Sequence, residues 1–213
     1  MTKKILIAVP SMDFVAAGFA ASLACLGKVG DCKVSFICGS LIYDARNKLA
    51  AQAIQLDTDF ILWLDSDMTF EPDTLVRLLK DAEENDLDIV SGLYFRRSSP
   101  YTPVAFETFD IVDDEAKFTH YNGELTGLHE VEGVGFGCLL MSTQVVFDVF
   151  GQYGDCFSPI AKVGEDLSFL WRARQIGYKT YLDADIKCGH VGHVVVSQDF
   201  YEAVHGGDEH DES

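Results

Sequence analysis

Five consecutive apolar residues, from Phe60 to Leu64, impose the strongest restriction on the fold of this chain. A strand that exposes one face to water alternates apolar and polar side chains, whereas a strand covered on both faces is apolar throughout. Strands of the second kind belong to parallel sheets that carry helices on both sides. The run therefore predicts a central strand in an α/β domain.

The rest of the chain alternates between short apolar runs and segments with helical periodicity. This order builds a mostly parallel central sheet flanked by helices. We expect strands at 5–9, 34–38, 60–64, 89–94, 134–141 and 178–182, and helices at 14–27, 45–55, 72–85, 143–150 and 165–176. Between residues 98 and 130 the pattern weakens into polar, turn-rich sequence, for which we expect loops or a hairpin.

Length and composition fit one domain. The chain has 213 residues, and its apolar content of 48% is enough for a core of ordinary size. We place the domain at residues 1–205. The tail at 206–213 is acidic and has no apolar side chain to anchor it, so we expect it to be disordered.

The net charge of −18 argues against nucleic acid as a partner, because contacts with a phosphate backbone need clustered Lys and Arg. A phosphorylated small molecule stays compatible with this charge if carboxylates hold a divalent cation. The six cysteines form no CxxC pair, which predicts reduced thiols, mostly in the core. The apolar stretch at 14–26 is shorter than the roughly 20 residues of a membrane span. We therefore expect no transmembrane segment and a cytoplasmic protein.

Two carboxylates, Asp65 and Asp67, directly follow the central strand. Open α/β sheets place ligands at the carboxyl ends of their strands, so both side chains are expected at such a site. Carboxylates one residue apart can share a hard cation, whose open positions then accept diphosphate oxygens. A structural alternative is that these residues cap a helix or satisfy turn amides, and a DxD pattern alone has many false matches.

The residues around this pair resemble family 2 glycosyltransferases with the GT-A fold. Three motifs carry the resemblance by their order and spacing: Ala45-Arg46-Asn47 before a helix, Asp65-Ser66-Asp67 after the strand, and Gly164-Glu165-Asp166-Leu167 further on, which looks like the ED motif of the group. The resemblance spans about residues 4 to 195. It implies a single Rossmann-like GT-A domain.

The resemblance also implies a reaction, the transfer of a sugar from a nucleotide diphosphate donor to an acceptor hydroxyl. Mn²⁺ or Mg²⁺ would neutralise the charge that grows on the leaving phosphate. By similarity, the metal ligands are Asp65, Asp67 and His190, with Asp67 the more direct ligand. His193 is an alternative to His190, and either histidine could instead belong to a structural network.

Asp166 has the position of the general base in inverting members of the family, where it takes the proton from the acceptor hydroxyl. Glu165 would then contact an acceptor hydroxyl or a neighbouring amide. In a retaining enzyme, Asp166 would only orient the acceptor. A structural role also stays open, because Gly-Glu-Asp at a helix start provides capping and favourable dipole interactions.

Further residues are candidate contacts of the nucleotide sugar: Pro10, Ser11, Arg46, Asp65, Ser66, Arg97 and Gly135. Gly135 belongs to a segment that resembles the one lining the donor sugar in GT-A folds, where missing side chains let the backbone approach a ligand. Arg46 could instead pair with Asp44 or Asp65, and Arg97 could be a solvated surface residue.

The chain departs from the family after its second strand. Family members commonly carry an acidic residue there that meets the nucleobase, whereas this chain has Cys38-Gly39-Ser40, so the base is not specified. The acceptor, which could be a glycan, a lipid-linked group, a protein or a small molecule, would be chosen by residues 98–130.

Two other functions fit the same fold class. A nucleotidyltransferase also uses a metal held by carboxylates, but it usually carries a glycine-rich loop with a basic residue after its first strand, where residues 10–13 here are Pro-Ser-Met-Asp. A non-catalytic nucleotide-sugar-binding domain would have no reason to retain both the pair of aspartates and Glu165-Asp166. The sequence therefore favours a metal-dependent glycosyltransferase.

Overall fold

The structure is a computed structural model, and it describes residues 2–192. The strands of this part are β1 (Lys4–Ser11), β2 (Asp31–Cys38), β3 (Phe60–Leu64), β4 (Met68–Thr69), β5 (Ile89–Leu93), β6 (Ala105–Val112), β7 (Glu115–His120), β8 (Leu128–Val131), β9 (Gly133–Val134), β10 (Cys138–Ser142), β11 (Thr180–Lys187) and β12 (Gly189–His190). The helices are α1 (Ala17–Cys25), α2 (Ile42–Gln55), α3 (Thr74–Asn85), α4 (Thr143–Tyr153) and α5 (Glu165–Gln175). The acidic tail predicted at 206–213 and the alternative ligand His193 lie outside the described residues.

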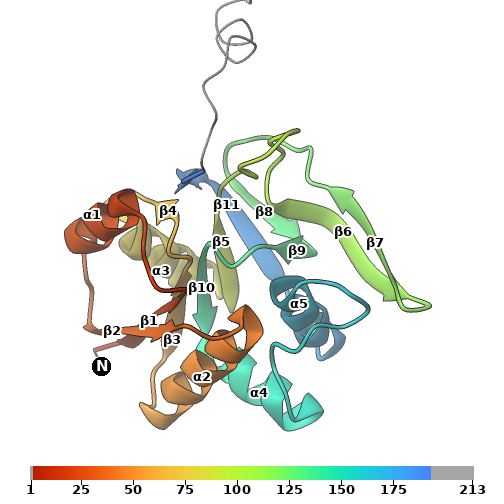
Figure 1. The fold of residues 1–213 in the computed structure, drawn as a ribbon, viewed down its shortest axis with the longest axis horizontal. Helices are drawn as coiled ribbons and strands as arrows, with labels where there is room; N and C mark the ends of the chain where they lie inside the picture. The colour runs from red at the N-terminus through yellow and green to blue at the C-terminus, as the bar shows by residue number, and fades with distance from the viewer. Residues whose placement is uncertain (1, 193–213) are drawn as a thin grey trace, which may run out of the picture.

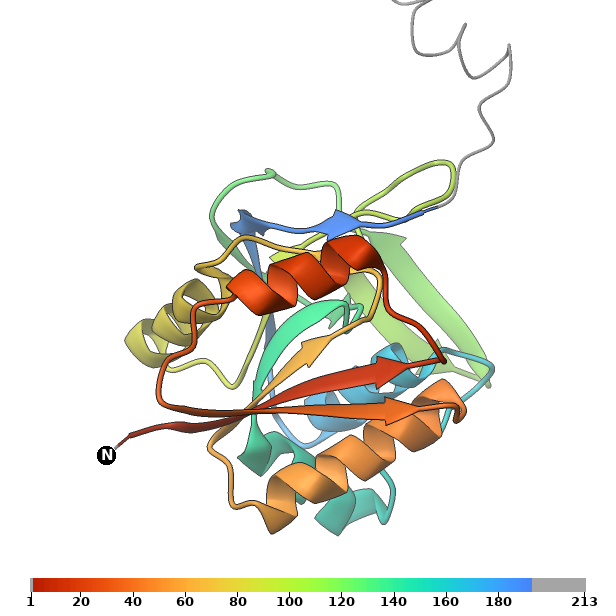
Figure 2. The same ribbon diagram turned by 60° about the vertical axis from the view of Figure 1, so that its left-hand side comes forward.

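Seven strands form the central sheet in the order β2-β1-β3-β10-β5-β11-β8. β1 is parallel to β2 and β3, and β5 is parallel to β11, whereas β10 and β8 are antiparallel to their neighbours. All strands except β10 and β8 therefore run in one direction, which confirms the mostly parallel sheet. Figure 1 shows helices on both sides of it, and Figure 2 shows α1 and α2 on opposite sides of β1 and β2.

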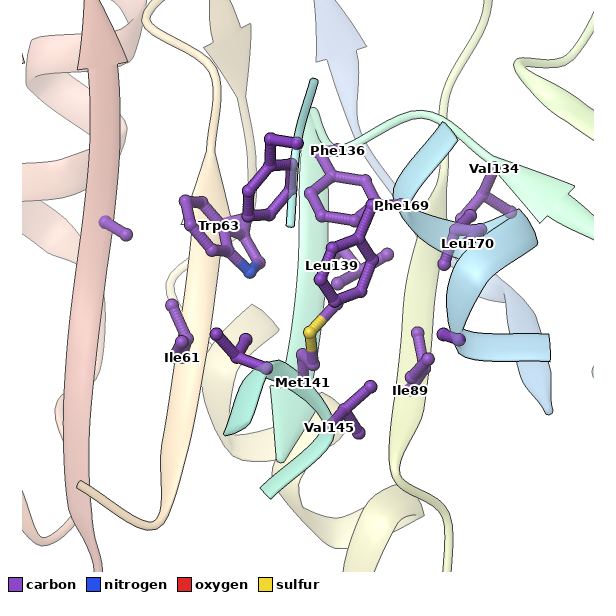
Figure 3. Close-up of a cluster of buried hydrophobic side chains, with 14 of the residues drawn as sticks. Ile61, Trp63, Ile89, Val134, Phe136, Leu139, Met141, Val145, Phe169 and Leu170 are labelled. Atoms are coloured by element: carbon purple, nitrogen blue, oxygen red, sulfur yellow. The ribbon is translucent and has the colours of Figure 1, made fainter. Parts of the chain in front are cut away.

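The buried strands divide their side chains between two cores. In β3, Ile61 and Trp63 belong to the core under α2, α4 and α5, whereas Leu62 and Leu64 belong to the core under α1 and α3. This division follows from the two-residue period of a strand. Figure 3 shows Ile61 and Trp63 in the first core, among side chains of β10, α4 and α5. The apolar run is thus covered on both faces, as the sequence predicts.

The segment 134–141 does not form the single strand that we predicted. β9 joins a separate three-stranded sheet in the order β7-β6-β9, and β10 enters the central sheet between β3 and β5. Local periodicity reveals that a segment is extended but does not reveal its partner, so it could not predict this antiparallel insertion. The hairpin expected between residues 98 and 130 is confirmed by the pairing of β6 with β7.

Two expectations from composition can also be compared with the structure. All six cysteines are free thiols, but only Cys138, Cys156 and Cys188 are buried, so the expectation that most lie in the core was wrong. Within residues 2–192, none of the helices combines the length and the apolar composition that crossing a bilayer requires.

The short strands β4 and β12 hold two distant parts of the chain together. They pair in an antiparallel manner, with His190 opposite Met68. The Val191 N–H donates to the carbonyl oxygen of Asp67 at 2.8 Å. This pairing brings the end of the described chain to the C-terminal edge of β3.

Candidate active site

The motif Asp65-Ser66-Asp67 lies in a tight turn between β3 and β4. The Asp65 N–H donates to the carbonyl oxygen of Gly137 at 3.1 Å, and the Asp65 carbonyl accepts from the Met68 N–H at 3.1 Å. The turn leaves β3 at its C-terminal end, beside the parallel strand β1, where open α/β sheets place ligands. The side chains of both aspartates are partly exposed, so a ligand can reach them.

A cavity of about 400 Å³ lies at this edge of the sheet, and we call it the first cavity. Its lining contains every residue that the sequence predicts for the metal and the base: Asp65, Asp67, His190, Glu165 and Asp166. It also contains all but one of the predicted donor contacts: Pro10, Ser11, Arg46, Ser66 and Arg97. The structure thus brings together residues from β1, α2, the turn after β3, the loop after β5, α5 and β12.

Gly135 is the predicted site residue that does not line the first cavity. A Cβ atom at this position would lie 2.0 Å from the Tyr94 Oη. The neighbouring Gly137 N–H donates to the same hydroxyl at 3.2 Å. The packing of Tyr94 therefore accounts for the glycine at 135 without a ligand.

Arg46 links the two acidic motifs. Its side chain is 2% exposed, donates from Nη2 to Asp65 Oδ1 at 2.9 Å, and donates from Nε to Glu165 Oε1 at 3.0 Å. The guanidinium also lies over the rings of Trp63 and Phe136, at 5.6 and 5.2 Å. Burial alone would lower the pKa of Arg46, but Asp65 and Glu165 more than offset this effect and raise it. Of the pairings considered from the sequence, the one with Asp65 is present.

Burial has the opposite effect on the pKa of the Asp65 carboxyl group. Loss of hydration raises the pKa of Asp65, and the nearby charge of Asp67 adds to the rise, while Arg46 opposes it. The ion pair with the buried Arg46 fixes the position of this carboxylate, because moving it would leave Arg46 without one of its two partners.

Asp67 has a second cation and an imidazole beside it. Arg97 Nη1 donates to Asp67 Oδ2, and His190 Nε2 lies 3.5 Å from the same oxygen. The contact with His190 lowers the pKa of Asp67 and raises the pKa of His190. His190 Nδ1 lies 2.9 Å from the carbonyl oxygen of Phe95, which can only accept, so Nδ1 carries a proton.

The positions of the Asp67 carboxylate and the His190 imidazole suit a divalent cation. In the neutral imidazole of His190, the proton on Nδ1 leaves a lone pair on Nε2, on the side of Asp67. A second hydrogen bond that fixes the tautomer in this way is usual for a metal-binding histidine. Within residues 2–192, no group of three or more His, Cys, Asp or Glu side chains is close enough to form a complete metal site. Asp67 and His190 are the two neighbouring side chains here that could contribute ligands to a divalent cation.

Asp166 is at the start of α5, in the wall of the first cavity. Its Oδ1 accepts a hydrogen bond from the Leu167 N–H at 2.8 Å. A Cβ atom at residue 164 would lie 2.8 Å from that oxygen, so the glycine there makes room for the carboxyl group. Loss of hydration, with a contribution from the charge of Glu165, raises the pKa of Asp166 to about 6. A carboxylate with this pKa is ionised at neutral pH and can still accept a proton effectively.

Two polar atoms of the lining residues have no hydrogen-bond partner among residues 2–192. They are Ser40 Oγ and Arg46 Nη1, and both are buried. An unpaired buried polar group is costly unless a ligand or water satisfies it. The two atoms therefore indicate where a polar ligand would contribute hydrogen bonds.

Some residues of the site were missed by the sequence analysis. Met12 and Ile42 line the first cavity although they are apolar and exposed, and exposure of single apolar residues has no sequence signal. Tyr94 packs its ring against His190 at 5.6 Å, and its neighbour Phe95 supplies the carbonyl that fixes the imidazole. The only available signal was a tyrosine at the end of an apolar strand.

The comparisons with known proteins agree with this fold. The sequence model described as "Glycosyl transferase family 2" matches residues 41–150, which is more than half of the chain. The crystal structure of A197 from STIV has a similar fold, with a TM-score of 0.66, 16% identity, and coverage of 90% of this chain and 86% of that one. No curated protein is significantly similar in sequence. The chain therefore belongs to glycosyl transferase family 2, and the protein is a glycosyltransferase.

Proposed function

We propose that the protein transfers a sugar from a nucleotide diphosphate donor to an acceptor hydroxyl, in a metal-dependent reaction that inverts the configuration of the sugar. The observation that carries this proposal is the content of the first cavity. It combines the carboxylate–imidazole pair of Asp67 and His190 with a separate carboxyl group, Asp166. These residues come from three parts of the chain, and each has the chemistry that one part of the reaction needs.

The donor would bind with its diphosphate near Asp67 and His190, which would hold Mn²⁺ or Mg²⁺. Asp65 is a further candidate ligand, although its contact with Arg46 gives it a structural role as well. The ion would supply electrostatic stabilisation of the charge that develops on the diphosphate. The unpaired Ser40 Oγ and Arg46 Nη1 support a polar donor in this cavity.

Asp166 would act as the general base. It would accept the proton of the acceptor hydroxyl while the oxygen of that hydroxyl forms a bond to the anomeric carbon of the sugar. The bond between that carbon and the diphosphate oxygen breaks, and its electron pair leaves with the diphosphate. The pKa of Asp166, raised to about 6, supports this role, because the ideal base has a pKa near the working pH.

A thermal-shift experiment with sugar nucleotides tests the donor and the metal together. A ligand that binds only the folded state at 100 times its Kd stabilises the protein by about 2.7 kcal/mol. We expect one donor of a panel of uridine, guanosine and adenosine diphosphate sugars to raise the Tm in Mn²⁺, and the rise to shrink in EDTA. Asp67→Asn should remove the metal-dependent part of the shift.

The matched control is Asp73→Asn. Asp73 is exposed before α3 and its side chain caps no helix amide, so this variant should keep the full shift. If Asp67→Asn keeps it as well, Asp67 does not bind the metal. If no sugar nucleotide shifts the Tm of the wild-type protein, the proposed donor class is wrong.

A further inference from the structure

A second cavity, of about 380 Å³, shares a wall with the first cavity. Asp166 lines both cavities. The volume is within the range of small-molecule sites in proteins. A general base must contact the group that it deprotonates, so a base that acts on one molecule beside another is expected between their two sites. Asp166 has this position.

The hairpin of β6 and β7 forms one wall of the second cavity. On β7, Phe118 and His120 both line it, as the two-residue period of a strand allows. On β6, Phe106 and Phe109 are three residues apart, and a regular strand would direct them to opposite faces. The register between β6 and β7 shifts between Phe106 and Thr108, and such a bulge reverses the alternation. Both rings therefore line the same cavity.

Phe106, Phe118 and His120 of this wall are in contact and incompletely buried, whereas Phe109 is fully buried. The ring of Phe106 lies 5.3 Å from that of Phe118 and 5.1 Å from that of His120. Phe118 is 50% exposed, so half of its surface contributes nothing to the hydrophobic core. Covering this ring with the face of another ring would remove apolar surface from water and add a directional contact. The wall is therefore suited to a flat, ring-shaped ligand.

The charges of the second cavity are not compensated. Arg96 and Lys162 line it, and neither forms an ion pair within residues 2–192, whereas the adjacent Arg97 is paired with Asp67. Asp166 is the single carboxylate among the lining residues. The chain carries 34 acidic side chains against 16 basic ones, and here two cations lie at one cavity with a single carboxylate. They would attract a negatively charged group.

We propose that the second cavity binds the acceptor, and that the acceptor has a ring-shaped body, a hydroxyl directed to Asp166 and a negatively charged group near Arg96 and Lys162. This inference rests on the proposed function. The ring could belong to an acidic sugar or to a phenol that carries an acid, because the C–H face of a sugar and the face of a phenol both pack against aromatic side chains, and both ligands carry an anionic group. Phe118 and Phe106 bind the ring, and Arg96 and Lys162 discriminate against neutral acceptors.

Binding of matched probes without a donor tests this assignment. The sugar probes are methyl β-glucuronide and methyl β-glucoside, whose only ring is the sugar, and the phenol probes are 3-(4-hydroxyphenyl)propionate and 3-(4-hydroxyphenyl)propanol. Within each pair, the members differ chiefly in the carboxylate. We expect the anionic member of at least one pair to bind about three- to tenfold more tightly by calorimetry, as solvent-exposed ion pairs allow. The pair that shows the preference identifies the source of the ring.

Two variants and two controls connect the binding to the second cavity. Phe118→Ala should weaken both members of the preferred pair by about tenfold, whereas Lys162→Gln should weaken only the anionic member. Phe147→Ala removes a ring on α4 that is 56% exposed, and Lys117→Gln removes a cation from β7; neither residue lines the cavity, so both controls should bind like the wild type. The Tm of each variant verifies folding.

The acceptor assignment is overturned if none of the four probes binds in the millimolar range, if the charged and neutral members bind equally, or if Phe118→Ala and the Phe147→Ala control bind alike. Donor binding by the wild-type protein is measured separately. If a sugar nucleotide binds and the probes do not, only the acceptor assignment fails. If the probes bind as expected and no sugar nucleotide does, the proposed function fails and the second cavity is a binding site for another purpose.

Discussion

The two cavities that share Asp166 differ in how their cations are held. In the first cavity, Arg46 is paired with Asp65 and Glu165, and Arg97 is paired with Asp67. In the second cavity, the cations have no carboxylate partner in the described chain, and an exposed aromatic ring forms part of the wall. The first cavity is therefore largely organised before a ligand binds, whereas the second has no such internal pairing of its cations.

A comparison within the first cavity explains this preorganisation. Arg46 and Arg97 bind the two aspartates of the same motif, but the side chain of Arg46 is 2% exposed and that of Arg97 is 55% exposed. A buried cation cannot exchange its carboxylate partners for water at low cost. An exposed ion pair is weak and can yield to a ligand. We therefore assign Arg46 to the fixed framework and expect Arg97 to adapt when a donor binds.

The largest expected effect concerns the carboxyl group that the cavities share. Asp166→Asn should leave donor binding unchanged and lower turnover by about 10²- to 10⁴-fold, the range that general base catalysis contributes. Turnover is measured as release of the nucleotide diphosphate, and donor binding by calorimetry. Asp73→Asn is the control with unchanged turnover. An Asp166→Asn protein with wild-type turnover would remove Asp166 as the base.

The next largest effect is a difference in stability between variants of the two arginines, Arg46 and Arg97. Arg46→Met should lower the free energy of unfolding by about 3–5 kcal/mol, because it leaves Asp65 and Glu165 without their buried partner. Arg97→Met should lower it by less than about 1 kcal/mol, because that pair is exposed. Urea unfolding measures both. Equal losses in the two variants would contradict the distinction between framework and adaptable contacts.

The smallest effect is the dependence of turnover on pH. Asp166 must be ionised to accept a proton, and its pKa is raised to about 6 by loss of hydration and by Glu165. The value of kcat/KM should therefore fall about tenfold per pH unit below pH 6 and level off above it. An aspartate with its ordinary pKa of about 3.9 would place the break about two units lower. A profile that stays level down to pH 5 would show that Asp166 does not control the rate.

Much of the first cavity could be predicted because its motifs follow strands that are recognisable locally. Asp65 and Asp67 directly follow an apolar run, and the C-terminal end of a parallel strand is a known ligand position. A glycine is harder to interpret from sequence, because it can make room either for a ligand or for a distant side chain. At Gly135, the distant side chain is that of Tyr94. The sequence placed the choice of acceptor in residues 98–130, but the shape of the second cavity could not be predicted, since it depends on a bulge in β6 that changes the faces of Phe106 and Phe109.

The amino-acid sequence was enough to predict the class of the fold and the strand that ends at the acidic motif, and to name the residues that we propose for metal binding and catalysis. These properties depend on periodicity and on neighbours along the chain, which local sequence encodes. Tertiary contacts were needed to establish which carboxylate Arg46 binds, how β12 brings His190 to Asp67, and that Asp166 lies between two cavities. These features depend on contacts between residues far apart in the chain, and strand pairing and packing select them.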